Sequence, residues 1–172
     1  RTANRWMHSA WVPAKGEKMS KSVGNGLSVP VVLKEHSAWV VRYALGSVQY
    51  RSMLEWSDQT LAEAQAAYDR ITNFIEHAAE ALGEQPSREE ITGVSADDLP
   101  VDFVAAMNDD INVSRATAAI FTQVRAGNTQ LTELVDDAES DKRAALRTTL
   151  VNVRAMLDTL GLDPLAEPWV SG

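Results

Sequence analysis

Residues 57–83 read SDQTLAEAQAAYDRITNFIEHAAEALG, and their periodicity predicts one long amphipathic helix. The apolar side chains recur in alternating steps of three and four, at Leu61, Ala64, Tyr68, Ile71, Ile75, Ala78 and Leu82. Ser57 offers a hydroxyl that can cap the first turn, Asp58 complements the helix dipole, and Gly83 is a natural C-terminal stop. A stripe of this kind is typical of a helix packed in a bundle.

Further helical signals lie on both sides of this stretch. Ser37 is a candidate cap for a helix that ends at Gly46, and the apolar character of that helix predicts burial. Beyond residue 83 we predict a loop over 84–99, a short helix over about 100–107, a helix from Asn112 to Gly127, and a last helix that ends at Gly161. The predicted fold class is therefore mainly α, with an antiparallel helical bundle over residues 57–162.

Composition separates the chain into a basic part and an acidic part. The 172 residues carry a net charge of −8 and contain no cysteine, which excludes disulfides and thiolate metal sites. Residues 1–56 hold eight Lys or Arg against three Asp or Glu, whereas residues 57–172 hold eight against twenty-one. This asymmetry suggests two functional parts, with phosphate binding in the basic one. No apolar run approaches the length of a membrane span, and we expect no membrane association.

The basic part contains the sequence Lys18-Met19-Ser20-Lys21-Ser22 within a glycine-bounded run from Gly16 to Asn25. Lysine supplies mobile positive charge, serine supplies donors, and glycine lets the backbone come close to a ligand. The alternative is a solvated polar turn. We predict instead a loop that closes over a polyphosphate, and its spacing differs from that of a Walker loop.

Several motifs together resemble the cysteinyl-tRNA synthetase family of class I aminoacyl-tRNA synthetases. The pentapeptide Lys18-Met19-Ser20-Lys21-Ser22 resembles the second signature of that class. The other motifs are Trp6-Met7-His8-Ser9, Arg42-Tyr43, Tyr50-Arg51-Ser52, Trp56-Ser57, Ala106-Met107-Asn108-Asp109-Asp110-Ile111-Asn112 and Leu160-Gly161-Leu162. The resemblance covers nearly the whole chain, and its first stretch is the more specific.

The resemblance implies roles for particular residues. Lys21, assisted by Lys18, would stabilise the ATP triphosphate and the transition state of adenylate formation, and Met19, Ser20 and Ser22 would complete the ATP-binding loop. The residues that it suggests for contact with tRNA are Arg51, Arg143, Arg147 and Arg154. It further implies the end of the catalytic fold over 1–25, a stem-contact region over 26–56, a tRNA-facing bundle over 57–162 and an irregular tail over 163–172.

The partners implied are tRNA(Cys), ATP with Mg²⁺, and cysteine. The first ATP signature of the class, the zinc ligands of the family and its anticodon-reading domain do not occur in this sequence. We therefore expect an internal piece of a cytoplasmic ligase that is inactive alone. Zinc and cysteine would bind elsewhere in the parent enzyme, and the N-terminal piece of that enzyme is a possible partner.

Two alternative functions stay open at this stage, and a possible cation site has also to be considered. A ligase that transfers cysteine to an amino-sugar, as in mycothiol biosynthesis, shares the phosphate loop and a helical tail. A non-catalytic helical module that binds RNA or protein belongs to another class of function. Asp109, Asp110 and Asn112 offer oxygen ligands for a cation, although helix capping explains Asn112 more simply and we assign no metal site.

Overall fold

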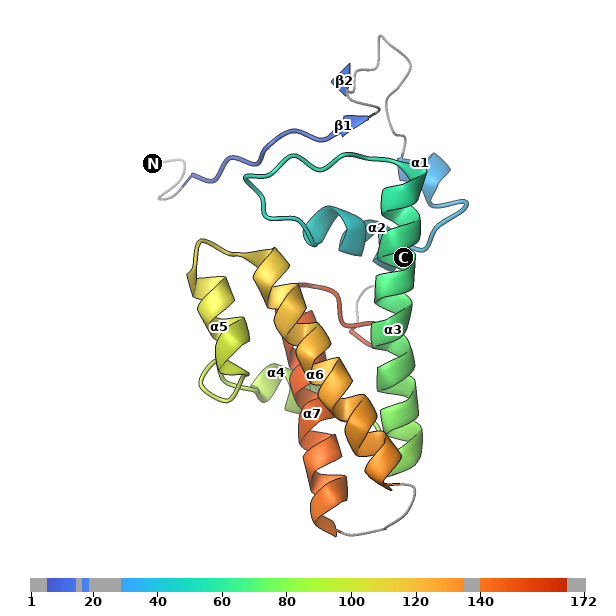
Figure 1. Cartoon of the computed structure of the whole chain (residues 1–172), viewed down its shortest axis with the longest axis vertical. Coiled ribbons are helices and arrows are strands. Elements are labelled where there is room, and N and C mark those ends of the chain that lie inside the picture. The colour runs from blue at the N-terminus through green and yellow to red at the C-terminus, as the bar shows by residue number, and fades with distance from the viewer. Residues whose placement is uncertain (1–5, 15–16, 19–28, 135–139, 167–172) are drawn as a thin grey trace. The chain divides into compact units, whose positions relative to one another are not determined.

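The computed structural model describes residues 6–14, 17–18, 29–134 and 140–166. The chain forms two compact units, residues 1–66 and residues 67–172, which are treated separately below. The described chain is mainly helical, as the sequence predicts (Figure 1).

The first unit contains a very short antiparallel hairpin and two helices. Strand β1 (Pro13–Ala14) pairs with β2 (Glu17–Lys18), and α1 (Val29–Val32) and α2 (Ala38–Gly46) follow. The hydroxyl of Ser37 accepts a hydrogen bond from the amide of Val40 at 3.3 Å, which confirms the predicted cap of α2. The predicted burial of α2 is also confirmed at Val40, Val41, Tyr43 and Ala44.

Helix α3 (Asp58–Leu82) begins in the first unit and continues through the second. Ser57 accepts a hydrogen bond from the amide of Thr60 at 3.1 Å, as an N-cap does. Gly83 has a φ of +72°, a left-handed conformation that glycine adopts without steric cost and that ends the helix. All seven apolar residues of the predicted stripe are buried, so the periodicity identified both the helix and its packing face.

The second unit packs three further helices against one another. Helix α6 (Val113–Leu134) lies against both α5 (Val101–Asn108) and α7 (Ser140–Thr159), and these contacts bury Phe103, Ile120, Leu146, Leu150 and Leu157 (Figure 1). The side-chain oxygen of Asn112 accepts a hydrogen bond from the amide of Arg115 at 3.2 Å, so the predicted cap of α6 is confirmed. Asp109 forms an ion pair with Arg115 at 3.0 Å.

Two predictions about this unit are wrong. Residues 84–99 are not a continuous loop, because α4 (Arg88–Gly93) forms within them, capped by Ser87 and packed against α7. Helix α6 does not end at Gly127 but continues to Leu134. Gly127 is a buried residue within that helix. Because it has no side chain, the ring of Phe74 can lie directly against its backbone.

The segment after α7 folds back against α3. Gly161 has a φ of +67°, and the amide of Leu162 donates to the carbonyl of Leu157 at 2.7 Å. The buried hydroxyl of Tyr68 then donates to the carbonyl of Leu162 at 3.1 Å. Within the ranges described here, none of the helices has the length and apolar character needed to cross a membrane.

Candidate functional site

The hairpin of the first unit leads directly into the predicted polyphosphate loop. The antiparallel register places Pro13 opposite Lys18 and Ala14 opposite Glu17, so the backbone of Lys18 ends β2. The other members of the loop, Met19 to Ser22, lie outside the described residues. Lys18, the first residue of the predicted loop, thus lies at the end of β2.

Two long-range backbone hydrogen bonds hold the chain before the loop. The amide of Ala10 donates to the carbonyl of Tyr50 at 2.7 Å, and the amide of Trp56 donates to the carbonyl of Pro13 at 2.9 Å. The hairpin is therefore attached to the segment that contains Arg51. The guanidinium of Arg51 lies 5.1 Å from the centre of the Tyr50 ring, within the range of a cation–π contact. Arg51 is exposed, and contact with RNA at this residue stays a prediction.

The three arginines predicted on α7 have internal partners. Arg143 donates to the carbonyls of Ala81 and Leu82 at 3.1 and 2.6 Å, where it satisfies carbonyls at the C-terminus of α3. Arg147 donates to Glu84 at 2.8 Å and, through two nitrogens, to both carboxylate oxygens of Glu90 at 2.6 and 3.0 Å. These contacts join α7 to the end of α3 and to α4.

The bidentate contact between Arg147 and Glu90 changes the acidity of both groups. The hydrogen bond from Arg147 holds the pKa of Glu90 below its usual value, although partial burial opposes this effect. The hydrogen bonds to Glu90 and Glu84 raise the pKa of Arg147 in turn. The pair is charged at neutral pH and connects the two helices.

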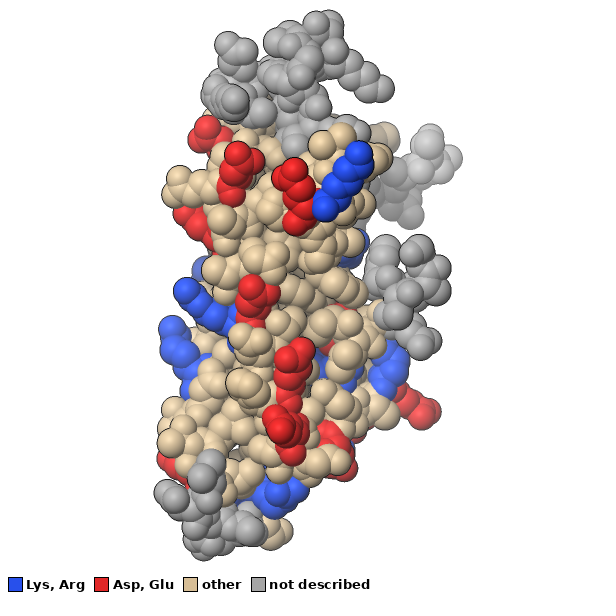
Figure 2. Space-filling view, turned by 90° about the vertical axis from the view of Figure 1, so that its right-hand side faces the viewer, with Lys and Arg blue, Asp and Glu red and all other residues tan. Residues whose placement is uncertain are grey.

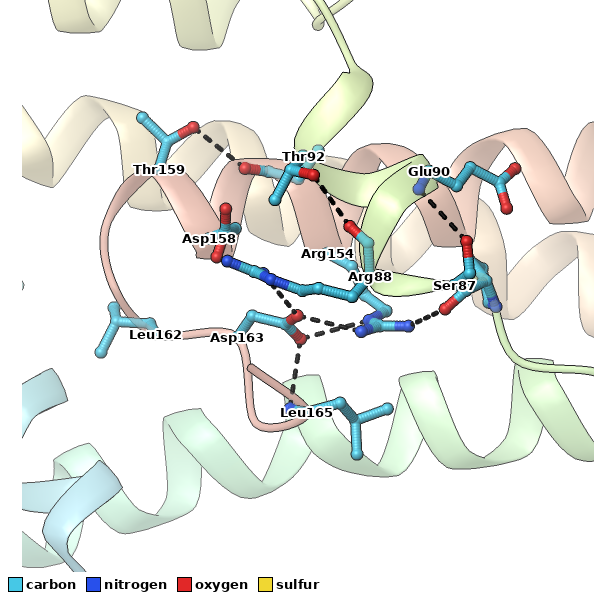
Figure 3. Close-up of polar contacts among 12 residues, drawn as sticks. Ser87, Arg88, Glu90, Thr92, Arg154, Asp158, Thr159, Leu162, Asp163 and Leu165 are labelled. Carbon is cyan, nitrogen blue, oxygen red and sulfur yellow. Dashed lines mark hydrogen bonds and ion pairs between the residues drawn. The ribbon is translucent and has the colours of Figure 1, made fainter. Parts of the chain in front are cut away.

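Arg154 is the most deeply buried of the predicted contact residues, with 2% of the residue exposed. Its guanidinium donates to the carboxylate of Asp163 at 3.2 and 3.0 Å and to the carbonyl of Pro86 at 2.6 Å (Figure 3). Arg88 approaches the same carboxylate at 3.7 Å and forms an ion pair with Asp158 (Figure 3). The guanidinium of Arg154 thus has internal partners, and the predicted contact with RNA would require this end of the bundle to open.

The structure also brings together polar residues that the sequence analysis missed. A groove between α3 and α6 in the second unit is lined by Arg70, Asn73, His77, Arg125 and Asn128. The signal was present in the sequence, because spacings of three and seven residues place these side chains on one face of each helix. No cluster of three or more His, Cys, Asp or Glu that could hold a metal ion occurs in the part of the chain that the structure describes.

Comparison with known protein families identifies both ends of the chain. Residues 1–66 match the family model described as the catalytic domain of class I (C) tRNA synthetases, and residues 102–162 match the DALR domain. The chain thus belongs to the class I aminoacyl-tRNA synthetases. Within this class it belongs to the cysteine–tRNA ligase family, which confirms the resemblance found in the sequence.

Three relatives illustrate the match, and each is named as a cysteine–tRNA ligase. The chain is 77% identical to that of Bifidobacterium longum over 171 residues, which are 99% of this chain and 31% of the relative. It is 49% identical to that of Beutenbergia cavernae over 169 residues, 98% of this chain and 34% of the relative. It is 43% identical to that of Streptomyces avermitilis over 169 residues, which are 97% of this chain and 33% of the relative. The chain therefore spans about a third of the length of the curated relatives that it matches.

Proposed function

We propose that this chain works as part of a ligase that activates cysteine with ATP and transfers it to tRNA(Cys). The observation that carries the proposal is the identity of 77% along 99% of the chain to a protein named as a cysteine–tRNA ligase. The lysine loop adds a chemical reason, because Lys18 and Lys21 are the residue type that stabilises charge on a triphosphate. A cytoplasmic location belongs to the same proposal, since tRNA and ATP are used there.

Lys21 would act in the activation step. The carboxylate of cysteine attacks the α-phosphorus of ATP, the bond to the bridging oxygen breaks, and pyrophosphate leaves with its electron pair. Negative charge on the phosphate oxygens increases along this path, so the ammonium of Lys21 binds the transition state more tightly than the ground state. Lys18 would assist, while Ser20, Ser22 and the backbone near Met19 would position the triphosphate. Mg²⁺ would accompany ATP as part of the substrate.

The RNA acceptor would bind the helical part of the chain. Among the predicted contact residues, Arg51 is exposed in the structure. Arg143 and Arg147 would contact phosphate only through the N–H groups that do not already donate to their internal partners. The zinc that the resemblance implies would bind outside this chain, because the sequence contains no Cys and lacks the zinc ligands of the family. The division into loop, stem-contact region and bundle remains part of the proposal.

A chimera tests this function. The chain would replace the matching segment of the Bifidobacterium longum relative, and cysteine-dependent exchange of pyrophosphate into ATP and charging of a tRNA(Cys) transcript would both be measured. We expect Lys21→Ala to lower the exchange rate by about 10²–10³, the usual effect of removing one transition-state donor. Lys34→Ala is the matched control, because this exposed lysine lies in the same unit outside the loop.

Two results would contradict the proposal. One is an exchange rate that Lys21→Ala leaves unchanged. The other is transfer of cysteine to an amino-sugar in place of tRNA, which would favour the alternative ligase.

A further inference from the structure

A groove of about 670 Å³ separates α3 from α6 in the second unit. We call it the α3–α6 groove and define it by Arg70, Asn73 and His77 on α3 and by Arg125 and Asn128 on α6. Phe74 and Val124, both buried, also line it. The groove thus combines five polar side chains with apolar residues between them.

Among the described residues, no carboxylate forms an ion pair with the arginines of this groove. Within the described residues, the side chain of Arg70 makes no hydrogen bond or ion pair, and the guanidinium of Arg125 donates a hydrogen bond to the hydroxyl of Thr122 at 3.1 Å. None of the described residues that line the groove is an Asp or a Glu. Elsewhere in the same unit Arg88, Arg115, Arg147 and Arg154 each have a carboxylate partner.

Within the second unit, the acidic residues of α3 lie on another strip of the helix. Asp69, Glu76 and Glu80 are exposed and follow one another at spacings of seven and four, so they share a face beside that of Arg70 and His77. Figure 2, which looks toward the side on which α3 lies, shows carboxylates along the middle of this side and basic side chains nearer its edges. In a chain whose net charge is −8, Arg70 and His77 therefore lie on a different strip of the helix from these three carboxylates.

We propose that the α3–α6 groove binds the sugar–phosphate backbone of RNA. This inference rests on the proposed function, which supplies an RNA substrate, and it assigns a surface for that substrate on the bundle. Arg70 and Arg125 would each neutralise a phosphate. Asn73, Asn128 and His77 would hydrogen-bond ribose hydroxyls or base edges, and the apolar residues between them would contact ribose.

The dimensions of the groove fit a short length of strand. Residues 70 and 77 are seven positions apart on α3, which at about 1.5 Å per residue corresponds to roughly 10 Å along the helix axis. A nucleic-acid strand advances about 3.4 Å per nucleotide along its helix axis. The groove is therefore long enough for two or three nucleotides.

Binding to the 172-residue chain tests the inference directly. The probe is a fluorescein-labelled tRNA(Cys) transcript, and its anisotropy is titrated with protein at several salt concentrations. We expect the double substitution Arg70→Gln and Arg125→Gln to weaken binding by about tenfold or more. Because two phosphate contacts are removed, the slope of log K against log salt should also fall by about 1.4 to 1.8.

Arg115→Gln is the matched control. Arg115 lies on the same helix as Arg125 and is exposed, but it pairs with Asp109 and does not line the groove. The control removes one arginine charge outside the groove, where each groove substitution removes one inside it, and it should leave the affinity within about twofold. Equal affinities and salt slopes for the wild-type chain and the groove variant would overturn the inference, as would no binding by the wild-type chain.

Two further measurements separate the possible failures. Poly-glutamate at matched charge concentration should compete poorly with the transcript, and competition equal to that of RNA would overturn the inference in favour of an acidic polypeptide. In the chimera, the groove variant should raise the KM for tRNA(Cys). If the unsubstituted chimera activates cysteine and the groove variant leaves this KM unchanged, the groove inference fails while the proposed function stands.

Discussion

The ring of Phe74 occupies the space that a side chain at position 127 would need. A Cβ atom built on Gly127 would overlap the Cε2 and Cζ atoms of that ring and would lie 3.2 Å from Cγ2 of Thr149. Phe74 is 1% exposed, so its ring has little room to move away. Gly127 therefore allows α6 to approach α3 closely beneath the α3–α6 groove.

Gly127→Ala should destabilise the second unit. The overlap with Phe74 costs about 1–3 kcal/mol, as overpacking of a core does, and the better helix propensity of alanine returns up to about 1 kcal/mol. We expect a net loss of about 1 kcal/mol or more in the free energy of unfolding, measured by urea denaturation. Gly93→Ala is the control, because nothing lies within 4 Å of a Cβ at that position. Equal stability of the two variants would contradict the close packing described here.

The buried pair of Arg154 and Asp163 gives a second prediction. Asp163→Asn removes the charge that the guanidinium faces, and an unpaired buried charge destabilises a protein by about 3–5 kcal/mol. The control is Asp158→Asn, which breaks the partly exposed pair with Arg88 and should cost about 1 kcal/mol or less. Replacing both members by Met and Leu should be less harmful than Asp163→Asn alone. If Asp163→Asn costs no more than Asp158→Asn, the buried pair does not stabilise the bundle.

The pair of Glu90 and Arg147 predicts a dependence of stability on pH. Since the hydrogen bond from Arg147 lowers the pKa of Glu90 in the folded chain from its ordinary value of 4.5, the folded state favours the carboxylate. The stability that the ionised Glu90 contributes is fully present above the pKa of Glu90 in the unfolded chain. It is lost as the pH falls through the lower pKa of Glu90 in the folded chain. The difference in unfolding free energy between wild type and Glu90→Gln should thus be largest near pH 7 and shrink below about 4.5.

Glu89→Gln serves as the control for this measurement. Glu89 is the neighbouring residue in α4, and its carboxylate has no ion pair among the described contacts. The difference between wild type and this variant should stay nearly constant over the same pH range. A difference for Glu90→Gln that does not change between pH 7 and pH 3 would rule out the linkage.

Local sequence signals predicted the long helix and most of the caps. The apolar stripe from Leu61 to Leu82 predicted the helix correctly, because apolar residues spaced by three and four mark one buried face, whatever that face packs against. The N-caps at Ser37, Ser57 and Asn112 were predictable because a cap depends only on residues within four positions of it in the chain. These features need no knowledge of the rest of the fold.

Features that depend on distant residues were not predictable in this way. Gly127 looked like a helix stop, but the position that it fills against Phe74 comes from another helix. Helix α4 is short, and its buried residue Ile91 gives no periodic signal by itself. The internal partners of Arg147 and Arg154 could not be predicted, because only the folded chain brings Glu84, Glu90 and Asp163 within reach of them. Arg70 and Arg125 were missed for the opposite reason, since sequence does not show which cations lack a partner.

Ile111 provides the last prediction, because it has a φ of +53°, a conformation that is unusual for a β-branched residue. It follows Asp110, whose φ is +54°, at the turn between α5 and α6. The left-handed conformation costs roughly 1–2 kcal/mol for most residues, and asparagine tolerates it better. Ile111→Asn should therefore stabilise the unit by about 0.5–1 kcal/mol, because the side chain is 41% exposed and loses only part of its burial. Ile111→Val keeps the β-branch and should give no gain. A higher urea midpoint for Ile111→Asn with an unchanged m-value would support release of backbone strain, whereas equal midpoints for the two variants would show that the turn holds none.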